Sequence, residues 1–517
     1  MTYTIEKVTT LIGAHRFGTA DANIGFLLTD SRSLCFAEET LFFALKSGRN
    51  DGHNYISDLY RRGVRNFVVQ DVPAGYSTAY PDANFLKVAD SLVALQRLAE
   101  RHRDEYDIPI VGITGSNGKT IVKEWLYQLL SPEMKVTRSP RSYNSQIGVP
   151  LSVWLLNEQS QVGVFEAGIS EPGEMLALRD IIQPSIAVLT FIGDAHQKNF
   201  TSLEEKCREK VILFHDAKTI VYCKDDTIVD EIVNESQYKG ENLAWSMNDD
   251  SVPFFVESVE KKELNSVIHY TWRGEEGEYT LPFIDEASVR NSVTTAVVAL
   301  HLGLSKTLLA ERMQSLEPVA MRLEVKEGQH GCTLINDSYN SDINSLDIAL
   351  DFMNRRPDHK GLGRTLILSD IYQTGEPLDE LYAEVSNLAV QRGVTKIIGI
   401  GPQIMDHADL IKVKEKFFFH DVTSFIHSAV FESLHDEVIL IKGARRFGFD
   451  SITELLVKKV HETILEVNLS GVVKNLNFYR SFMRPETKLV CMIKADAYGA
   501  GAVEIAKTLQ DHRVDYL

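Results

Sequence analysis

The fold is decided by residues 107–125, DIPIVGITGSNGKTIVKEW. The apolar run 108–113 predicts a buried strand, and the residues from 119 onward follow a helical pattern. The turn between them consists of Gly115, Ser116, Asn117, Gly118, Lys119 and Thr120. Glycines in such a turn let backbone N–H groups converge on a polyphosphate, and the N-terminus of the following helix adds positive potential. The stretch therefore predicts a nucleotide-binding loop between a strand and a helix.

The loop has the shorter G-x-x-G-K-T form, because Ile113 stands where the first glycine of the full G-x-x-x-x-G-K-[ST] spacing would be. In loops of this kind the lysine reaches the terminal phosphates and the hydroxyl sits on Mg²⁺. These roles fall to Lys119 and Thr120. The alternative is a glycine-rich strand-to-helix turn with an exposed lysine and no ligand.

The composition limits the class of protein. A chain of 517 residues is too long for one core, since domains average ~150 residues. The net charge of −18 argues against nucleic acid as the main partner. The five cysteines have no paired spacing, which indicates a reducing compartment without disulfides or a zinc site. We see neither a signal-peptide core nor an apolar run long enough to span a membrane, so we expect a cytoplasmic protein.

Strand candidates alternate with helical segments along most of the chain, which predicts an α/β fold with parallel sheets. The candidates lie at 41–45, 66–69, 162–165, 186–189, 333–335, 365–368, 396–400 and 438–441. Composition and pattern divide the chain into segments 1–103, 104–316, 317–458 and 459–517. In the last segment we expect a strand at 488–494 and a helix at 501–509, after which the sequence breaks off in what looks like another strand. The charge-dense piece at 273–278 is expected to be a solvated hairpin turn.

Polar residues follow the strand candidates of the second segment. Glu166 ends the strand before EAGISEPGEM, where a carboxylate can hold Mg²⁺, although a surface glutamate is the alternative. His196 follows the strand at 187–190 in FIGDAHQKNF, where a loop histidine without function is the alternative. Lys210 in EKCREKVILF reads, taken alone, as a solvated helix lysine.

Together, GITGSNGKT, EAGISEPGEM, GDAH and the Lys210-x-x-Leu-Phe motif resemble the Mur ligase family, which joins amino acids or peptides to a UDP-sugar carrier using ATP. The resemblance implies a three-domain ligase with a central P-loop parallel-sheet ATPase domain and a C-terminal Rossmann-like domain. It also implies that Lys210 is carbamylated and binds Mg²⁺ together with Glu166 and His196. A carbamate is a bidentate oxygen anion, the hard ligand that Mg²⁺ prefers.

Further segments resemble the family's binding motifs, among them TDSR, SPRSYNSQIGVPL, SVRNSVTTAVVAL, PVAMRLEV, LINDSYNSD and KGARRF. The expected nucleotide contacts outside the loop are Asn291, Arg322, Asp337 and Asn340. The expected substrate contacts are Asp30, Ser31, Arg32, Asn144, Lys442 and Arg445. The Asp-Ser-Tyr-Asn form and the type of N-terminal segment favour the branch that adds D-alanyl-D-alanine to UDP-N-acetylmuramoyl-tripeptide through an acyl phosphate.

The last segment resembles a second family, the fold-type III alanine racemases, in ILEVNLSGVVKNLNFYRSF and KLVCMIKADAYGAG. The resemblance implies that Lys494, at the end of a first barrel strand, forms the Schiff base with pyridoxal phosphate. A complete TIM barrel takes ~250 residues, so we expect 459–517 to be a truncated barrel that does not racemise alanine by itself. In the full-length fusion the racemase half would dimerise.

Two alternatives remain open. One is another ligase of this architecture, such as a folylpolyglutamate synthase, against which the UDP-sugar-like N-terminal segment argues. The other is a non-catalytic module that serves as a scaffold for the racemase. The joint presence of Lys119, Glu166, His196 and Lys210 argues against that second reading.

Overall fold

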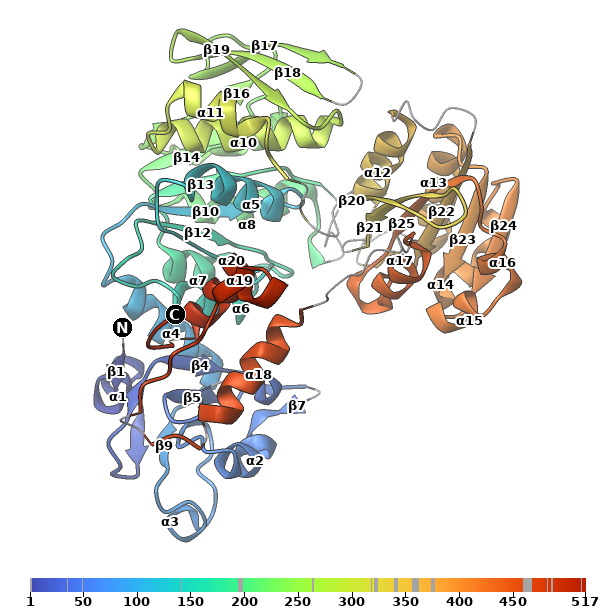
Figure 1. The fold of residues 1–517 in the computed structure, drawn as a ribbon. Helices are drawn as coiled ribbons and strands as arrows, with labels where there is room; N and C mark the ends of the chain where they lie inside the picture. The colour runs from blue at the N-terminus through green and yellow to red at the C-terminus, as the bar shows by residue number, and fades with distance from the viewer. Residues whose placement is uncertain are drawn as a thin grey trace. The chain divides into compact units, whose positions relative to one another are not determined.

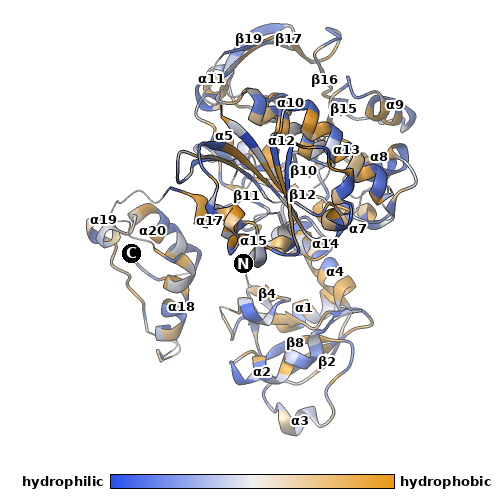
Figure 2. Ribbon diagram, turned by 90° about the vertical axis from the view of Figure 1, so that its right-hand side faces the viewer, coloured by the Kyte–Doolittle hydropathy of each residue, from blue (hydrophilic) through white to orange (hydrophobic). Residues whose placement is uncertain are grey.

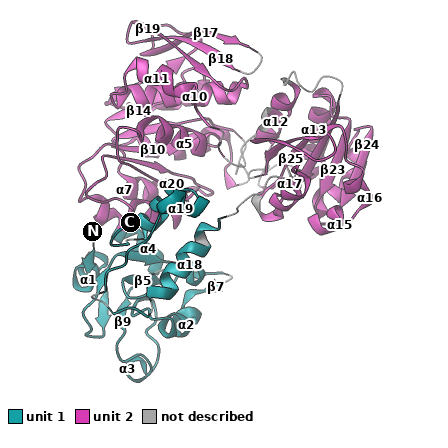
Figure 3. Ribbon diagram, in the orientation of Figure 1, with its two compact units in different colours: residues 1–98, 460–517 teal, residues 99–459 magenta. Residues whose placement is uncertain are grey.

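The computed structural model of the chain describes all residues except 1, 35, 49, 141, 194–198, 263–264, 318, 320–323, 339–342, 356–361, 373–376, 459–466, 481, 485–486 and 513. Its contacts divide the chain into two compact units (Figure 3). The first unit contains residues 1–98 together with 460–517, and the second contains residues 99–459.

The N-terminal part of the first unit is built on a 5-stranded sheet in the order β2-β9-β8-β5-β4. Its strands are β2 (His15–Phe17), β4 (Phe26–Leu28), β5 (Thr40–Phe43), β8 (Asn66–Val69) and β9 (Asn84–Lys87). Only β2 runs antiparallel to its neighbour. Two short strand pairs lie outside this sheet. One is β1 (Tyr3–Thr4) with β3 (Asn23–Ile24), and the other is β6 (Lys46–Ser47) with β7 (Asn50–Asp51). The helices are α1 (Ile5–Ile12), α2 (Ile56–Arg61), α3 (Tyr76–Ala79) and α4 (Ser91–Arg103), which continues into the second unit. The strands predicted at 41–45 and 66–69 are confirmed.

The second unit opens with a 6-stranded, wholly parallel sheet in the order β11-β12-β10-β13-β14-β15 (Figure 1). Its strands are β10 (Ile110–Thr114), β11 (Val136–Arg138), β12 (Val162–Glu166), β13 (Ile186–Leu189), β14 (Thr219–Val221) and β15 (Glu241–Asn242). Its helices are α5 (Lys119–Leu130), α6 (Gly148–Val153), α7 (Glu174–Ile182), α8 (Leu203–Val211), α9 (Thr227–Glu235), α10 (Glu286–His301) and α11 (Lys306–Met313).

Both faces of this sheet are covered, which explains why its strands read as nearly continuous apolar runs. Side chains alternate along β10, so that Val111 joins a core with α5, α10 and α11, and Ile110 joins a core with α6, α7, α8 and α9. Several of these helices are amphipathic, whereas α10 is buried along most of its length. In α9, for example, Val229, Ile232 and Val233 are buried in the second of these cores. The ribbon of this helix carries both apolar and polar residues (Figure 2). The predicted α/β architecture with a central parallel sheet is thereby confirmed.

A separate 4-stranded sheet, β16-β17-β18-β19, follows the parallel sheet in the chain. Its strands are β16 (Trp245–Ser246), β17 (Phe254–Lys261), β18 (Ser266–Trp272) and β19 (Glu275–Leu281). Only two residues, Arg273 at φ 51° and Gly274 at φ 84°, connect β18 to β19, and positive φ at both is the type I′ geometry of tight hairpins. The predicted turn at 273–278 is therefore shorter than expected, because the glutamates from 275 onward belong to β19.

The remaining sheet of the second unit is 6-stranded in the order β20-β21-β25-β22-β23-β24. Its strands are β20 (Glu324–Glu327), β21 (Thr333–Asp337), β22 (Gly363–Ser369), β23 (Lys396–Ile400), β24 (Glu415–Phe419) and β25 (Glu437–Lys442). All neighbours are parallel except β20 and β21. Its helices are α12 (Ile343–Arg355), α13 (Leu378–Gln391), α14 (Pro402–Asp406), α15 (Val422–Ile426), α16 (Ala429–Glu432) and α17 (Asp450–Leu456). This is the Rossmann-like arrangement that the sequence predicts.

The C-terminal residues contain the helices α18 (Leu469–Arg480), α19 (Lys494–Gly499) and α20 (Ala502–Asp511). The helix predicted at 501–509 is confirmed, but the strand predicted at 488–494 is wrong. That stretch makes one isolated parallel bridge, Val490 to Tyr516, and Lys494 begins α19. A parallel strand is stable only between neighbours, and within the described part of residues 467–517 this stretch pairs with Tyr516 alone.

None of the helices in the described part of the chain has the length and apolar character that crossing a bilayer requires.

Candidate active site

The turn after β10 adopts backbone conformations that favour glycine. Gly115 has φ 138° and Gly118 has φ 87°. A Cβ at position 115 would lie 2.1 Å from Thr190 Oγ1, and a Cβ at position 118 would lie 2.3 Å from Asn291 Oδ1. The glycine positions of the predicted loop are therefore held on one side by the end of β13 and on the other by α10.

We predict that Gly118→Ala weakens ADP binding at least tenfold, because the new methyl group both clashes with Asn291 and strains the backbone. Gly173→Ala is a matched control, since Gly173 also has a positive φ, 86°, but has no atom within 4 Å of its added Cβ. Calorimetric titration of both variants with ADP measures the difference. Equal ADP affinities for the two variants would contradict the steric argument.

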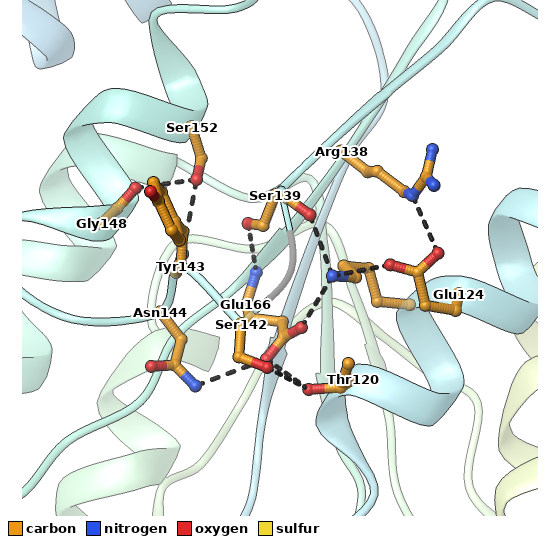
Figure 4. A network of polar contacts seen from close by, with 11 residues as sticks. Thr120, Glu124, Arg138, Ser139, Ser142, Tyr143, Asn144, Gly148, Ser152 and Glu166 are labelled. Carbon is orange, nitrogen blue, oxygen red and sulfur yellow. Dashed lines mark hydrogen bonds and ion pairs between the residues drawn. The ribbon is translucent and has the colours of Figure 1, made fainter. Parts of the chain in front are cut away.

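Glu166 lies at the end of β12, beside the phosphate-loop strand, in register with Ile113. Its side chain is fully buried, so the reading as a surface glutamate is wrong. Its Oε2 accepts hydrogen bonds from Thr120 Oγ1 at 3.1 Å and from Asn144 Nδ2 at 3.4 Å, and its Oε1 lies 3.1 Å from Lys123 Nζ (Figure 4). The structure thus brings together Thr120, Asn144 and Glu166, which the sequence assigns to metal and substrate.

Lys210 lies on α8 and is only 3% exposed, so the reading as a solvated helix lysine is wrong as well. Its Nζ donates to Gly115 O at 3.2 Å, and Lys119 Nζ donates to the same carbonyl at 2.7 Å. Burial holds the pKa of the Lys210 amine well below its usual range, and the nearby ammonium groups of Lys119 and Lys206 lower this pKa further. The Lys210 amine therefore lies at the phosphate loop in a setting that favours its neutral form.

The described residues contain no cluster of three or more His, Cys, Asp or Glu side chains that could hold a metal ion by itself. His196, the remaining predicted ligand, lies outside the described residues. Thr120 and Glu166 supply oxygen donors, and carbamylation of Lys210 would supply two more. These oxygen donors fit Mg²⁺ better than a transition metal.

The loop also closes onto the end of β13. Ser116 Oγ donates to Gly193 O at 2.9 Å and accepts from Gly193 N at 3.0 Å. Lys206, one turn before Lys210 on α8, donates to the same Gly193 carbonyl. These contacts fix the loop against the segment that leads to residues 194–198.

Asp337 and Lys442 end the neighbouring strands β21 and β25 and are paired in register. Lys442 Nζ lies 2.6 Å from Asp337 Oδ2, and both side chains are buried. Arg322, Asn340 and the side chain of Arg445 lie outside the described residues, although the backbone of Arg445 begins a short 3-10 turn, Arg445–Phe447. The structure thus places two of the predicted C-terminal contacts at one edge of this sheet.

Lys442→Met is expected to destabilise this sheet by about 3–5 kcal/mol, because it leaves the buried Asp337 carboxylate without its cation. Lys326→Met, which removes the more exposed pair with Glu324, should cost only about 0–1 kcal/mol. Hydrogen exchange of the β21 and β25 amides measures the local opening free energy. A similar loss of opening free energy in both variants would show that the buried pair contributes no more to stability than the exposed pair.

In the first unit, Asp30 caps the turn Ser31–Ser33 by accepting from Arg32 N at 3.0 Å. The Arg32 guanidinium lies 2.7 Å from Asp30 Oδ2, and this hydrogen bond lowers the pKa of the Asp30 carboxyl. Residues between 46 and 80 line a cavity of about 340 Å³. Asp30, Ser31 and Arg32 are not among its described lining residues. The lining residues include Lys46, Asp51, His53, Asp71 and Tyr80.

His53 orders the wall of this cavity. Its Nδ1 lies 2.6 Å from Asp51 Oδ1, and its Nε2 accepts from Gln70 N at 3.1 Å. Asp51 and His53 are not among the residues that the sequence assigns to the site. Lys123 is also absent from the site residues that the sequence predicts. It lies four residues after Lys119 among the apolar residues Val122, Trp125 and Leu126, and that spacing is the signal for a buried position.

Comparison with known proteins agrees with this geometry. The family model of the Mur ligase middle domain matches residues 113–299, and that of the alanine racemase N-terminal domain matches residues 467–517. The UDP-N-acetylmuramoyl-tripeptide–D-alanyl-D-alanine ligase of Bacillus subtilis is 25% identical over 442 residues, which cover 83% of this chain and 92% of the relative.

Solved structures have the same fold. MurF from Acinetobacter baumannii superposes with a TM-score of 0.75 at 21% identity, covering 88% of this chain and 99% of that one. MurF from Thermotoga maritima, solved in complex with ADP, gives a TM-score of 0.70 at 22% identity over 83% and 96% of the two chains. MurF-type ligases and their solved structures therefore match this chain over most of its length, and residues 467–517 match the start of an alanine racemase N-terminal domain.

Proposed function

We propose that the chain ligates D-alanyl-D-alanine to UDP-N-acetylmuramoyl-tripeptide at the expense of ATP. The observation that carries the proposal is the meeting of Lys119, Thr120, Glu166 and Lys210 at the carboxyl edge of one parallel sheet. This edge is where α/β proteins bind nucleotides. Relatives with the matching ligase name cover most of the chain.

The reaction has two steps. The terminal carboxylate of the tripeptide attacks the γ-phosphorus of ATP, and ADP leaves, which gives an acyl phosphate. The neutral amine of D-alanyl-D-alanine then attacks the acyl carbon, and inorganic phosphate leaves with the electron pair of the C–O bond. Phosphorylation is needed because a carboxylate oxygen is a poor leaving group.

The residues of the loop bind and orient the nucleotide. The N–H groups at the start of α5 would bind the phosphates, and Asn291 lies against Gly118, where it supports the loop. Lys119 would exchange its contacts with the Gly115 and Ser116 carbonyls for the transferring phosphate and neutralise its charge. Asn144, which donates to the same Glu166 oxygen as Thr120, would contact the γ-phosphate.

Thr120, Glu166, a carbamylated Lys210 and His196 would hold Mg²⁺, which supplies charge neutralisation on the phosphoryl oxygens. The carbamate forms when the neutral Lys210 amine adds to CO₂ and releases one proton. The low pKa that burial gives this amine favours the step.

We also propose that segments 1–103, 104–316 and 317–458 act as the UDP-sugar, ATP-binding and C-terminal ligase domains. Asp30, Ser31, Arg32, Lys442 and Arg445 would then contact the substrates, and Arg322, Asp337 and Asn340 the nucleotide. Pyridoxal phosphate is the cofactor that the racemase resemblance implies for segment 459–517. Lys494 begins a helix here rather than ending a barrel strand, so the described residues do not form such a site and we derive no step through it.

Release of ADP from ATP by the purified chain tests the proposal. Continuous ADP release over many turnovers should require both UDP-N-acetylmuramoyl-tripeptide and D-alanyl-D-alanine, because the amine is needed to consume the acyl phosphate. A folylpolyglutamate synthase would instead require a folate and glutamate, and a non-catalytic scaffold would release no ADP with any pair. Either of these results would contradict the proposed function.

A further inference from the structure

A chain of alternating charges leads from the protein surface to Glu166 (Figure 4). Arg138 Nε lies 3.0 Å from Glu124 Oε2, and Glu124 Oε1 lies 2.9 Å from Lys123 Nζ. Lys123 Nζ in turn lies 3.1 Å from Glu166 Oε1. The side chains of Lys123 and Glu166 are fully buried, whereas that of Glu124 is 21% exposed. The charges of these four side chains, two positive and two negative, therefore sum to zero.

The two oxygens of Glu166 have different surroundings. Oε1 faces the Lys123 ammonium, while Oε2 faces Thr120 Oγ1 and Asn144 Nδ2. Ser139 fixes both partners, since its carbonyl accepts from Lys123 Nζ at 2.9 Å and its Oγ accepts from Glu166 N at 3.2 Å. The carboxylate is thereby held with one oxygen toward Lys123 and the other toward the phosphate loop.

We propose that Lys123 is a positioning residue that restricts Glu166 to one oxygen as a metal ligand and so biases the site toward Mg²⁺ over Ca²⁺. The inference rests on the proposed function, in which Glu166 faces the metal. Mg²⁺ takes six ligands in a near-ideal octahedron at 2.0–2.1 Å and keeps several waters. Ca²⁺ takes 6–8 oxygens at 2.3–2.6 Å and accepts bidentate carboxylates. Bidentate binding by Glu166 would need Oε1, which lies 3.1 Å from the ammonium group of Lys123 in an ion pair without hydrogen-bond geometry, so that a metal at Oε1 would meet this positive charge.

Calorimetric titration with ADP, in Mg²⁺ and separately in Ca²⁺, tests this inference. The measured quantity is the ratio of the two ADP affinities, normalised to the parent chain. Lys123→Met should lower this ratio at least fivefold in favour of Ca²⁺, because Oε1 becomes available. Glu124→Gln keeps the contact between Lys123 and Glu166, so it should stay within twofold of the parent ratio.

Lys123→Met leaves one buried negative charge in excess, so a second variant guards against misfolding. In Lys123→Met combined with Glu124→Gln one positive and one negative charge are lost, and the local charge sum stays unchanged. This double variant should show the same shift in the ratio. A parental ratio in either folded variant overturns the proposal, as does loss of folding in both, which would give Lys123 a purely structural role.

Glu166→Gln separates this inference from the proposed function. If Glu166→Gln retains the full gain in ADP affinity that Mg²⁺ gives the parent, Glu166 is not a metal ligand and the proposed site is wrong. If Glu166→Gln loses that gain while Lys123→Met keeps the parental ratio, the proposed site stands and only the role of Lys123 is wrong.

Discussion

Lys119→Ala is expected to lower kcat/KM for ligation by at least 100-fold. Loss of one group that stabilises transition-state charge typically costs ~3–4 kcal/mol of barrier. The side chain is half-buried and donates to the Gly115 and Ser116 carbonyls, rather than facing solvent as the sequence suggests. The variant should still fold, because two such hydrogen bonds contribute only ~1–3 kcal/mol to stability.

Steady-state kinetics and thermal unfolding of the variant measure both effects. Lys224→Ala serves as the control, since Lys224 pairs with Asp249 at the surface of the same unit and has no place in the proposed site. Turnover of Lys119→Ala within tenfold of the parent would remove this loop from the mechanism.

Lys210→Ala is expected to be nearly inactive, and short carboxylates such as formate or acetate should restore part of the activity. The reason is that these anions can enter the space of the lost side chain and supply the missing oxygen ligand. In the parent chain, ¹³C-labelled bicarbonate should give one carbamate resonance by NMR, and this resonance should be absent from Lys210→Ala.

Lys206→Ala provides the matched control for Lys210→Ala. Lys206 is buried one turn away on α8 and contacts the Gly193 carbonyl, so its loss also empties a buried position. Carboxylates should not rescue this variant. Normal activity and Mg²⁺ dependence in Lys210→Ala would mean that the buried lysine only supports the loop.

The parallel sheets of this chain were predictable because their strands are short apolar runs that end in glycine turns or polar residues. The strands at 186–189 and 396–400 have the bounds that the sequence predicts. The sheet β16-β19 was not predicted beyond its turn, because strands such as β19 (EEGEYTL) alternate charged and apolar residues and do not resemble buried strands. The strand predicted at 488–494 was wrong because pairing, not pattern, decides whether a strand forms.

The motif residues of the loop were also readable from the sequence, but their burial was not. Glu166 and Lys210 resemble surface residues in the sequence, since Glu166 stands where a strand gives way to a loop and Lys210 lies among charged positions. Both side chains are buried with a partner: Lys123 forms an ion pair with Glu166, and the Gly115 carbonyl accepts a hydrogen bond from Lys210. Such contacts join residues 43 to 95 positions apart, and no local pattern encodes them.

The central claim is that a carboxylate of the acceptor is activated by phosphorylation on this P-loop domain. The most direct test uses UDP-N-acetylmuramoyl-tripeptide labelled with ¹⁸O in its terminal carboxylate, together with ATP and D-alanyl-D-alanine. Since the acyl phosphate keeps the bridging carboxylate oxygen on phosphorus, mass spectrometry should find one ¹⁸O in each inorganic phosphate released. Unlabelled phosphate would mean that water cleaves ATP, and would contradict the account.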